Sequence, residues 1–408
     1  MESKIEPVLK RTISLPLVTF YGIGTILGAG IYVLVGKVAG EAGMATPFSF
    51  LLASFLAGLS AFSYAELSSR FPRSAGEAVY LQQAFGIKNL SLIMGLLIVL
   101  IGLVSTATLI HGFIGYLGVF IDVIPWLTKV IIVITLALIV VWGIGQSVII
   151  ASVLTVIEIV GLLIIIWVTR DNVALAPSMT DNLLPSMDST VWLGVMMGAF
   201  IAFYAFVGFE DIVNVAEEVV NPTKNIPRAV ILSLIVTTIF YFIISIACVM
   251  TVSPEQLAAS DAPLAMIYEH QTGQSATVIV WISLLSVING ALVQVVMASR
   301  ILYGMAHQRW LPLILGHVNS VTQTPIIATV LVSFVILMFV LWLPLLSLAK
   351  LTSLVTLIVF SLINLALLVI KLKQPPHEAF SIPLWVPLIG FLTCSSFVMF
   401  MLYQLMIN

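Results

Sequence analysis

The sequence predicts an all-α polytopic membrane protein, and three observations lead to this fold class. Of the 408 residues, 61% are hydrophobic and only 8% are charged, and the mean hydropathy is +1.19. Such a composition is typical of chains that lie in a lipid bilayer. A helix needs about 20 apolar residues to cross the hydrocarbon layer, and eleven stretches of this kind follow one another along the chain. The few charged residues lie mostly between these stretches.

The eleven predicted spans have boundaries that are approximate by several residues. They cover residues 14–37, 45–67, 90–120, 126–142, 146–168, 191–216, 226–251, 277–306, 326–343, 345–371 and 383–406. The longest polar stretches between them, 170–189 and 253–274, leave no room for a soluble enzyme domain. We therefore expect the function to come from the helices, and we expect no enzyme.

The distribution of Lys and Arg predicts the orientation, because cytoplasmic loops collect positive charge. With the N-terminus inside, twelve of the 16 basic residues are cytoplasmic, and only Lys37, Lys129, Arg170 and Lys350 lie outside. Eleven crossings then place the C-terminus outside. A multi-pass protein of the cytoplasmic membrane is the expectation, with the N-terminal residues Lys4 and Lys10 in the cytoplasm.

The composition excludes several other kinds of partner. Both cysteines, Cys248 and Cys394, fall inside apolar spans, so no disulfide framework or metal site is expected. The net charge is −2 without a basic cluster, which excludes nucleic acid as a partner. We expect no cofactor beyond a coupling ion, either a proton or Na⁺. The expected partners are lipid and a small substrate; the oligomeric state is not specified by the sequence.

Two spans are interrupted in comparable ways. The first carries four glycines within 22–30, and glycine costs up to about 1 kcal/mol per helical position relative to alanine. The sixth carries Gly208 just before two carboxylates. Because these spans are five apart, they predict a 5+5 inverted repeat in which helices 1 and 6 are both discontinuous. The expected core is 1–375, with helices 1–5 over about 14–168 and helices 6–10 over about 191–371, followed by an additional helix within 376–408.

Four motifs carry a resemblance to a known family. They are the glycine-rich stretch 24–32, the Tyr-Ala-Glu-Leu segment 64–76, the Glu-Glu to Ile-Pro-Arg segment 216–228, and the Ser-Arg to Leu-Pro segment 298–312. In this order and at these helix ends, they resemble the amino acid, polyamine and organocation (APC) transporter superfamily over nearly the whole chain. The resemblance implies a secondary active permease for amino acids that works by alternating access, with a leucine-transporter-like core.

The resemblance also implies a binding site at the two breaks. The N–H groups of Gly28, Ala29 and Gly30 would hold a substrate carboxylate. Carbonyl groups around the breaks would hold its ammonium; they belong to Ile26, Tyr204, Ala205 and Val207, next to Gly208. Tyr204 would close over the substrate, with Phe206 as the alternative gate and Glu210 at the inner gate. The competing interpretation is that the glycines only permit close helix packing.

Glu158 is the most informative single residue, because no other charge lies between Lys129 and Arg170. Burying an ionised carboxylate at this depth costs about 2.5–3.5 kcal/mol even on the lenient insertion scale. Many proton-coupled relatives carry a lysine in the fifth span, so this chain has the opposite charge. Glu158 is expected to couple transport to protons, or to bind Na⁺ with oxygens of spans one and eight; a purely structural, protonated glutamate is the alternative. The available oxygens of span eight are those of Ser283, Ser286 and Asn289.

Other polar residues have open roles. Glu210 and Asp211 serve either as gate and cation-recognising acids or only as favourable charge at a helix N-terminus. His111 is either titratable or a packing donor. Ser105 and Thr106 either line the pocket or bond back to their own helix.

Several functions of the same fold remain as alternatives at this point. A carrier of polyamines or other organic amines and an amino acid exchanger share the architecture with a proton symporter. A channel or a non-transporting sensor is a different class that the sequence leaves open. No zinc-type or serine-hydrolase motif supports an intramembrane enzyme.

Overall fold

The computed structural model describes residues 11–73, 76–122, 124–142, 148–179, 183–319, 322, 324–374 and 379–407. Within these ranges the regular structure is helical, apart from a single bridge between Ile13 and Val219. Lys4, Lys10, the predicted start of the fifth span at 146 and the predicted domain boundary at 375 lie outside the described residues.

The helices follow the predicted spans closely. The longer ones are α1 (Leu15–Ala42), α2 (Thr46–Arg70), α3 (Gly76–Phe85), α4 (Lys88–Leu117), α5 (Pro125–Trp142), α6 (Val148–Val168), α9 (Ser189–Phe203), α11 (Pro222–Thr251), α13 (Pro263–Thr272), α14 (Thr277–His307), α15 (Ile326–Trp342), α16 (Leu345–Lys373) and α17 (Trp385–Ile407). The shorter ones are η1 (Gly43–Ala45), α7 (Arg170–Ala174), η2 (Ala176–Met179), η3 (Tyr204–Phe206), α10 (Asp211–Asn214), η4 (Ala216–Glu218), α12 (Pro254–Ala259) and η5 (Leu313–Gly316).

The membrane character of the bundle follows from helix length and composition. Among the described residues, seven helical segments are long and apolar enough to cross a membrane, or up to eight if one bent pair counts as a single span. Two shorter apolar helices, Pro125–Val141 and Ile326–Trp342, coincide with the predicted fourth and ninth spans. A polytopic all-α protein is confirmed at this level, and the total of eleven crossings stays a prediction.

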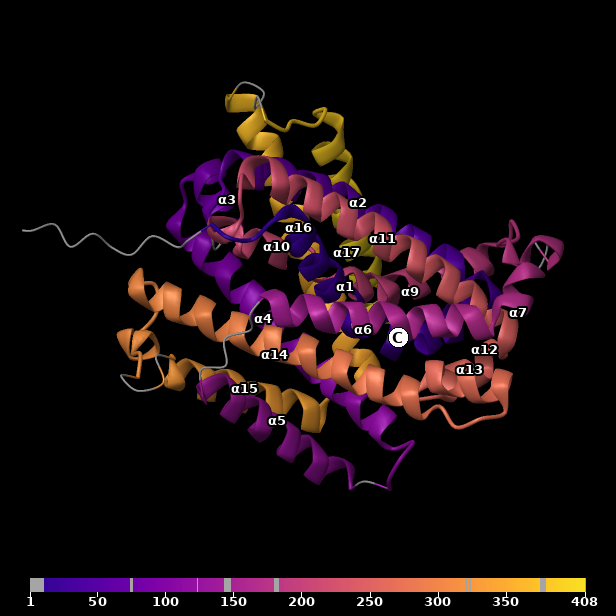
Figure 1. The fold of residues 1–408 in the computed structure, drawn as a ribbon. Helices are drawn as coiled ribbons and strands as arrows, with labels where there is room; N and C mark the ends of the chain where they lie inside the picture. The colour runs from indigo at the N-terminus through magenta and orange to yellow at the C-terminus, as the bar shows by residue number, and fades with distance from the viewer. Residues whose placement is uncertain are drawn as a thin grey trace, which may run out of the picture.

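The helices pack in a recurring set of pairs (Figure 1). α2 runs along α11, α4 runs along α14, α1 packs against α9, and α5 lies beside α15 at one edge of the bundle. α1 also contacts α6 and α11, so it lies at the centre of the bundle. The short helices α12 and α13 cover one end of α1. This arrangement surrounds the first span with neighbours from both halves of the chain.

The prediction that the first helix is discontinuous is wrong, because α1 is one α-helix over Leu15–Ala42. Its glycines serve close packing instead, which is the competing interpretation of the motif. A methyl group added at Gly24 would overlap the Thr155 side chain, and one added at Gly30 would overlap the backbone and Cβ of Ala205. Neighbouring helices therefore approach α1 closely at these glycines, and their contacts hold a glycine-rich stretch in helical form.

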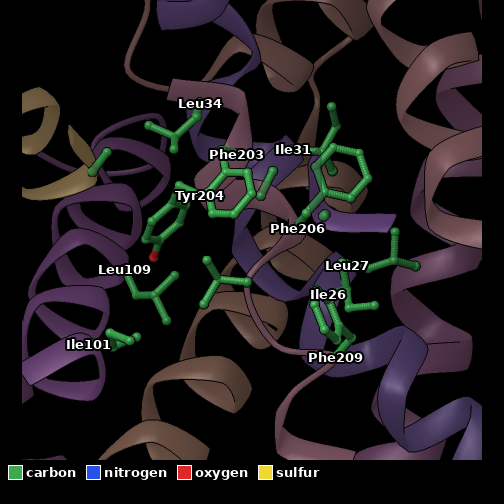
Figure 2. Close-up of a cluster of buried hydrophobic side chains, with 14 of the residues drawn as sticks. Ile26, Leu27, Ile31, Leu34, Ile101, Leu109, Phe203, Tyr204, Phe206 and Phe209 are labelled. Carbon is green, nitrogen blue, oxygen red and sulfur yellow. The ribbon is translucent and has the colours of Figure 1, made fainter. Parts of the chain in front are cut away.

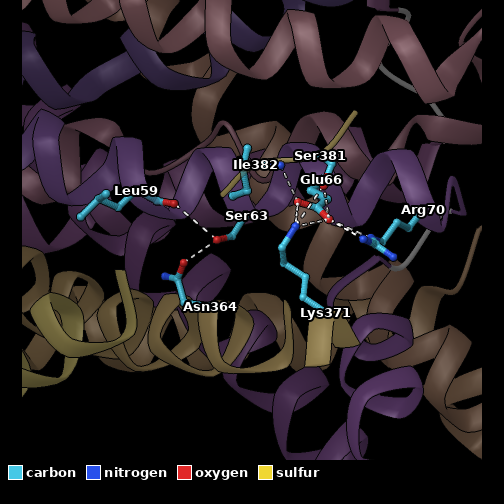
Figure 3. A network of polar contacts seen from close by, with 8 residues as sticks. All are labelled: Leu59, Ser63, Glu66, Arg70, Asn364, Lys371, Ser381 and Ile382. Atoms are coloured by element: carbon cyan, nitrogen blue, oxygen red, sulfur yellow. Dashed lines mark hydrogen bonds and ion pairs between the residues drawn. The ribbon is translucent and has the colours of Figure 1, made fainter. Parts of the chain in front are cut away.

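A buried ion-pair network fixes the end of α2 to α16 (Figure 3). The Glu66 carboxylate is fully buried and accepts hydrogen bonds from Arg70 at 2.6 Å and from Lys371 at 2.8 Å. It also accepts a 2.8 Å bond from the backbone N–H of Ile382, in the segment that leads to α17. A buried carboxylate with two cations and a backbone donor is well compensated. The Tyr-Ala-Glu-Leu motif thus has a structural role at this position.

A second polar contact joins α16 to α2, and α17 packs over it. Asn364 of α16 accepts a 2.6 Å bond from the Ser63 hydroxyl and donates a 2.9 Å bond to the Ser60 hydroxyl of α2. An added methyl at Gly390 would meet the Asn364 side chain at 2.6 Å, so α17 packs directly over this amide. Polar side chains between helices in an apolar medium stabilise specific packing.

Candidate functional site

The sixth span is broken, as the sequence predicts. α9 ends at Phe203, one 3₁₀ turn follows, and Val207 is extended with φ −66° and ψ 131°. Gly208 has φ +133°, a conformation that side chains disfavour, and an added Cβ would meet the Thr25 carbonyl oxygen at 2.5 Å. Only glycine fits here, because the break lies directly against α1.

Hydrogen bonds connect the break to α1. The Thr25 hydroxyl donates to the Gly208 carbonyl at 2.9 Å. The Tyr241 hydroxyl of α11 lies 2.7 Å from the Ile26 carbonyl oxygen and 2.8 Å from the Ala205 carbonyl oxygen. One phenolic proton is therefore shared between the two predicted ammonium-binding carbonyls. The structure thus brings the predicted residues of spans one and six together and identifies Tyr241 as their bridge.

The aromatic residues of the break extend toward different helices (Figure 2). The Tyr204 hydroxyl points at α4, where it lies 3.1 Å from the Ser105 hydroxyl and donates to the Ser105 carbonyl at 3.2 Å. The Phe206 ring packs edge-on against Tyr241 with a centroid distance of 5.0 Å. Both aromatics are buried. Tyr204 connects the break to α4, and Phe206 packs on the tyrosine that bridges the break to α1.

The predicted carboxylate cradle is not formed in this structure. The backbone of Gly28, Ala29 and Gly30 lies inside the continuous helix α1, where N–H groups bond to carbonyls four residues earlier. Gly28 is buried, yet an added methyl there would meet nothing within 4 Å. Its carbonyl accepts a hydrogen bond from the Ser286 hydroxyl of α14. A small open space therefore lies beside Gly28 between α1 and its neighbours.

Glu158 lies inside the bundle, as expected for an intramembrane acid. Its side chain is 1% exposed, and neither carboxyl oxygen makes a hydrogen bond of regular geometry with a described residue. The Ser286 and Asn289 side chains of α14 lie beside the carboxyl group. The Tyr32 hydroxyl of α1 donates to the Glu158 backbone carbonyl at 2.7 Å. The carboxyl thus lies where α1, α6 and α14 meet.

A cluster of three acids lies next to the break, and two of them directly follow it in the sequence. The Glu210 carboxylate accepts a 2.8 Å bond from the Gly208 N–H, which stabilises the break itself. Asp211 follows in the first turn of α10, and Glu77 of α3 faces both. Burial and the charge of Glu210 raise the pKa of Glu77 to about 7. Three buried carboxyl groups therefore lie on this side of the break.

The remaining predicted polar residues divide between the two interpretations. Ser105 bonds across to Tyr204, whereas Thr106 bonds back to Gly102 of its own helix at 2.8 Å. His111 Nε2 lies 3.0 Å from the Leu343 carbonyl, which is the geometry of a packing donor. The Ser283 hydroxyl bonds to its own helix at Ile279. In the described part of the chain, no group of three or more His, Cys, Asp or Glu side chains could hold a metal ion.

Sequence reasoning missed several residues of this region. Tyr241 had no local signal, because an aromatic in an apolar span is commonplace. Glu77 follows a polar segment and reads as a solvated cytoplasmic acid, but the structure leaves it only 2% exposed. Gln294 stands in an apolar span and is 7% exposed, so a search for intramembrane amides would have found it.

Comparison with known proteins gives the family. A family model described as amino acid permease matches residues 13–408. The chain belongs to the amino acid permease family. It is therefore a multi-pass membrane protein of a transporter family, as the four motifs predict, and not an enzyme. The APC resemblance is confirmed.

The names of individual relatives refer to different transported substrates. The chain is 26% identical to a mitochondrial cationic amino acid transporter of Arabidopsis thaliana, over 91% of this chain and 64% of that protein. It is 29% identical to a branched-chain amino acid permease of Bacillus subtilis, over 93% and 85% of the two chains. It is also 29% identical to a methylthioribose transporter of the same bacterium, over 96% and 88%. The chain thus spans just under two thirds of the Arabidopsis relative.

Proposed function

We propose that this protein is a secondary active transporter of amino acids that works by alternating access across the cytoplasmic membrane, with its N-terminus inside. Membership of the amino acid permease family supports this function, as do the names of relatives from a plant and a bacterium. The observation that carries the proposal is the break of the sixth span at Tyr204–Gly208, packed against α1 in the centre of the bundle.

The packing of the helices supports the 5+5 repeat. If a two-fold axis relates spans 1–5 to spans 6–10, the spans close to that axis pack against their equivalents, and α1 with α9, α2 with α11, α4 with α14 and α5 with α15 all pack together. Such an axis also requires reciprocal contacts. α1 packs on α11 while α9 packs on α2, and α4 packs on α16 while α14 packs on α6. These pairs are those expected from the repeat.

The substrate would bind at the break with its ammonium group on the carbonyls of Ile26 and Ala205. Both carbonyls already converge on a single donor, the Tyr241 hydroxyl. An ammonium has three donors and a full charge, so it is a stronger partner for two carbonyls than one phenol is. Tyr204, which is held by Ser105, would close the site from the side of α4. The open space beside Gly28 would accommodate part of the bound molecule.

Proton coupling would pass through Glu158. A buried carboxyl without a regular hydrogen bond is costly in the ionised form, so it favours the protonated form until the site rehydrates. Its neighbour Ser286 also bonds to the Gly28 carbonyl, which connects the acid to the space next to the break. Loss of the proton from Glu158 would therefore change the hydrogen bonding of Ser286 next to the substrate site.

Uptake by the purified chain in proteoliposomes tests this function. We expect saturable, concentrative uptake of an amino acid when the outside is acidic, and we expect Glu158→Gln to remove the response to the pH gradient. Glu255→Gln is a matched control, because Glu255 is exposed in α12. A flux that only dissipates gradients would indicate a channel, and uptake that depends on Na⁺ alone would assign the coupling to sodium.

A carrier of cationic amino acids or other organic amines is the second candidate. The buried acids Glu77, Glu210 and Asp211 favour it, because they place negative charge next to the break. Competition separates the two candidates: excess lysine or putrescine would block labelled uptake in a cation carrier, whereas excess leucine would block it in a neutral amino acid carrier. Exchange is recognised by uptake that requires substrate inside the vesicle.

A further inference from the structure

A small cavity lies beyond the break, on the side of α3 and away from Glu158. It is lined by three acids, two polar side chains and five apolar ones: Glu77, Glu210, Asp211, Tyr64, Gln294, Ile98, Ile101, Met297, Val359 and Phe360. All three acids are at least nine-tenths buried. No ion pair among the described residues involves any of them.

Three negative charges in this cavity would be unstable. Like charges at close range disfavour joint ionisation, and burial adds a desolvation cost for each of them. The groups that face the acids do not compensate. The neighbours of Glu77 are the neutral side chains of Tyr64 and Tyr80. The neighbour of Asp211 is Tyr21, and the positive charge of Arg300 lies near this tyrosine. The acids therefore require neutralisation, either by bound protons or by another bound cation.

Unpaired atoms in the cavity indicate what this species is. Gln294 is 7% exposed; its amide donates to Asp211 at 3.3 Å, but its own Oε1 has no hydrogen-bond partner. Asp211 Oδ1 is also buried without a partner. Buried polar atoms are rarely left in this state. A proton on Asp211 turns its oxygen into a donor, and Gln294 Oε1 is an unused acceptor lining the same cavity.

We propose that the cavity between Glu77, Glu210, Asp211 and Gln294 is a second proton-binding site, distinct from Glu158. A bound metal ion is disfavoured, because the side chains of the described acids do not converge as a metal requires. Gln294 follows Asn289 by five residues, which is about 8 Å along α14, so the cavity is separate from the Glu158 carboxyl.

Protonation of the cavity would affect the segment that follows the break. Glu210 holds the Gly208 N–H, and Asp211 begins α10, so both belong to the segment that must move if the sixth span opens. Protonation removes the repulsion between this segment and Glu77 of α3. Proton release restores the repulsion and favours separation of α10 from α3. The inference deepens the proton-coupled transport proposed above, but proton binding at the cavity is measurable without transport.

The test is infrared spectroscopy of the purified full-length chain in lipid nanodiscs. A protonated carboxyl group has a characteristic C=O stretch. Difference spectra between about pH 5 and pH 8 therefore report those acids that lose a proton in this range, which exposed Asp and Glu side chains mostly do at lower pH. We expect a band that persists in Glu158→Gln and loses intensity in both Glu77→Gln and Asp211→Asn. Glu255→Gln, at an exposed acid, is expected to leave the band unchanged.

The outcomes separate the two proposals. If the band in wild type disappears entirely in Glu158→Gln, the second site is overturned, whatever the other variants do. If lysine or putrescine at constant pH displaces the protons from the band assigned to Glu77 and Asp211, the cavity is a substrate-cation site and the inference is also overturned. A titrating band with no uptake in proteoliposomes keeps the second site and rejects proton-coupled transport.

Discussion

Two glycines of α1, two residues apart, are predicted to respond in opposite directions to the same substitution. Gly30 lies against Ala205 at the break, and an added methyl would overlap the Ala205 Cα as well as its Cβ. Gly28 borders open space, and an added methyl there would meet nothing within 4 Å. Both positions are helical, so the change in helix propensity is the same for the two. The difference between Gly30→Ala and Gly28→Ala therefore isolates the packing of α1 on the break.

The expected magnitudes follow from two opposing effects. Alanine stabilises an interior helical position by up to about 1 kcal/mol relative to glycine. Overpacking costs about 1–3 kcal/mol, and Gly30 belongs at the upper end because backbone atoms cannot rotate away. We expect Gly30→Ala to lower the free energy of unfolding by about 2 kcal/mol. Gly28→Ala is expected to raise it by up to about 1 kcal/mol.

The assay is unfolding of the two purified variants in the same detergent, followed by tryptophan fluorescence, with uptake measured in parallel. Lower stability of Gly30→Ala together with wild-type or higher stability of Gly28→Ala is the expected result. If the two variants were equally stable, the close contact between α1 and Ala205 would be absent, and the packing interpretation of the glycines would be refuted. A stable Gly28→Ala that has lost uptake would place the substrate in the open space beside Gly28.

Three further perturbations test other parts of the structure. Lys371→Met removes one of two cations from buried Glu66 and is expected to cost about 2 kcal/mol of stability, measured by chemical unfolding. Tyr241→Phe removes the hydroxyl that joins α1 to the break and is expected to cost about 1–2 kcal/mol, with Phe240, a partly buried neighbour, substituted by leucine as the control. Because the pKa of Glu77 is raised from 4.5 to about 7, the folded state binds the proton more tightly than the unfolded state. Its stabilisation is complete below pH 4.5 and is lost, by about 3 kcal/mol, as the pH rises through 7; a Glu77→Gln variant should show a flatter stability profile, and an unchanged slope would contradict this.

The fold class was predictable because its signals are physical requirements of the bilayer. A spanning helix must be apolar over its whole length, so each of the predicted stretches from 14–37 to 383–406 could be found from hydropathy alone. The break at Gly208 was also predictable, since a glycine followed by two acids within an apolar stretch is a poor helix interior.

The continuity of α1 was not predictable from composition. Glycine weakens a helix and equally permits close approach of a neighbouring backbone, and the sequence does not say which effect dominates. In the structure Gly24 and Gly30 face Thr155 and Ala205, from α6 and from the break, and these contacts favour the helical form. The partners come from parts of the chain more than 100 residues away. Local propensity carries no information about them.

The burial of charges near helix ends was not predicted from the sequence. Glu66, Arg70 and Glu77 lie at or just beyond the end of the second span, yet both carboxylates are buried and the Arg70 side chain is 5% exposed. Their burial depends on α16, since Lys371 supplies the second cation for Glu66. The positive-inside rule counts such a lysine as a topological signal, whereas here it also neutralises a buried acid.

The two acid clusters differ in how they are neutralised, and this difference connects structure to function. Glu66 has two cations and a backbone donor, so its charge is fixed and it holds α2, α16 and the approach to α17 together. Glu77, Glu210 and Asp211 form no ion pair with a described residue. A fixed charge suits a permanent joint, whereas uncompensated acids next to a broken helix suit a joint that must open. The same low-dielectric surroundings thus produce a scaffold contact at one end of α2 and, as we propose, a proton-dependent contact at the break.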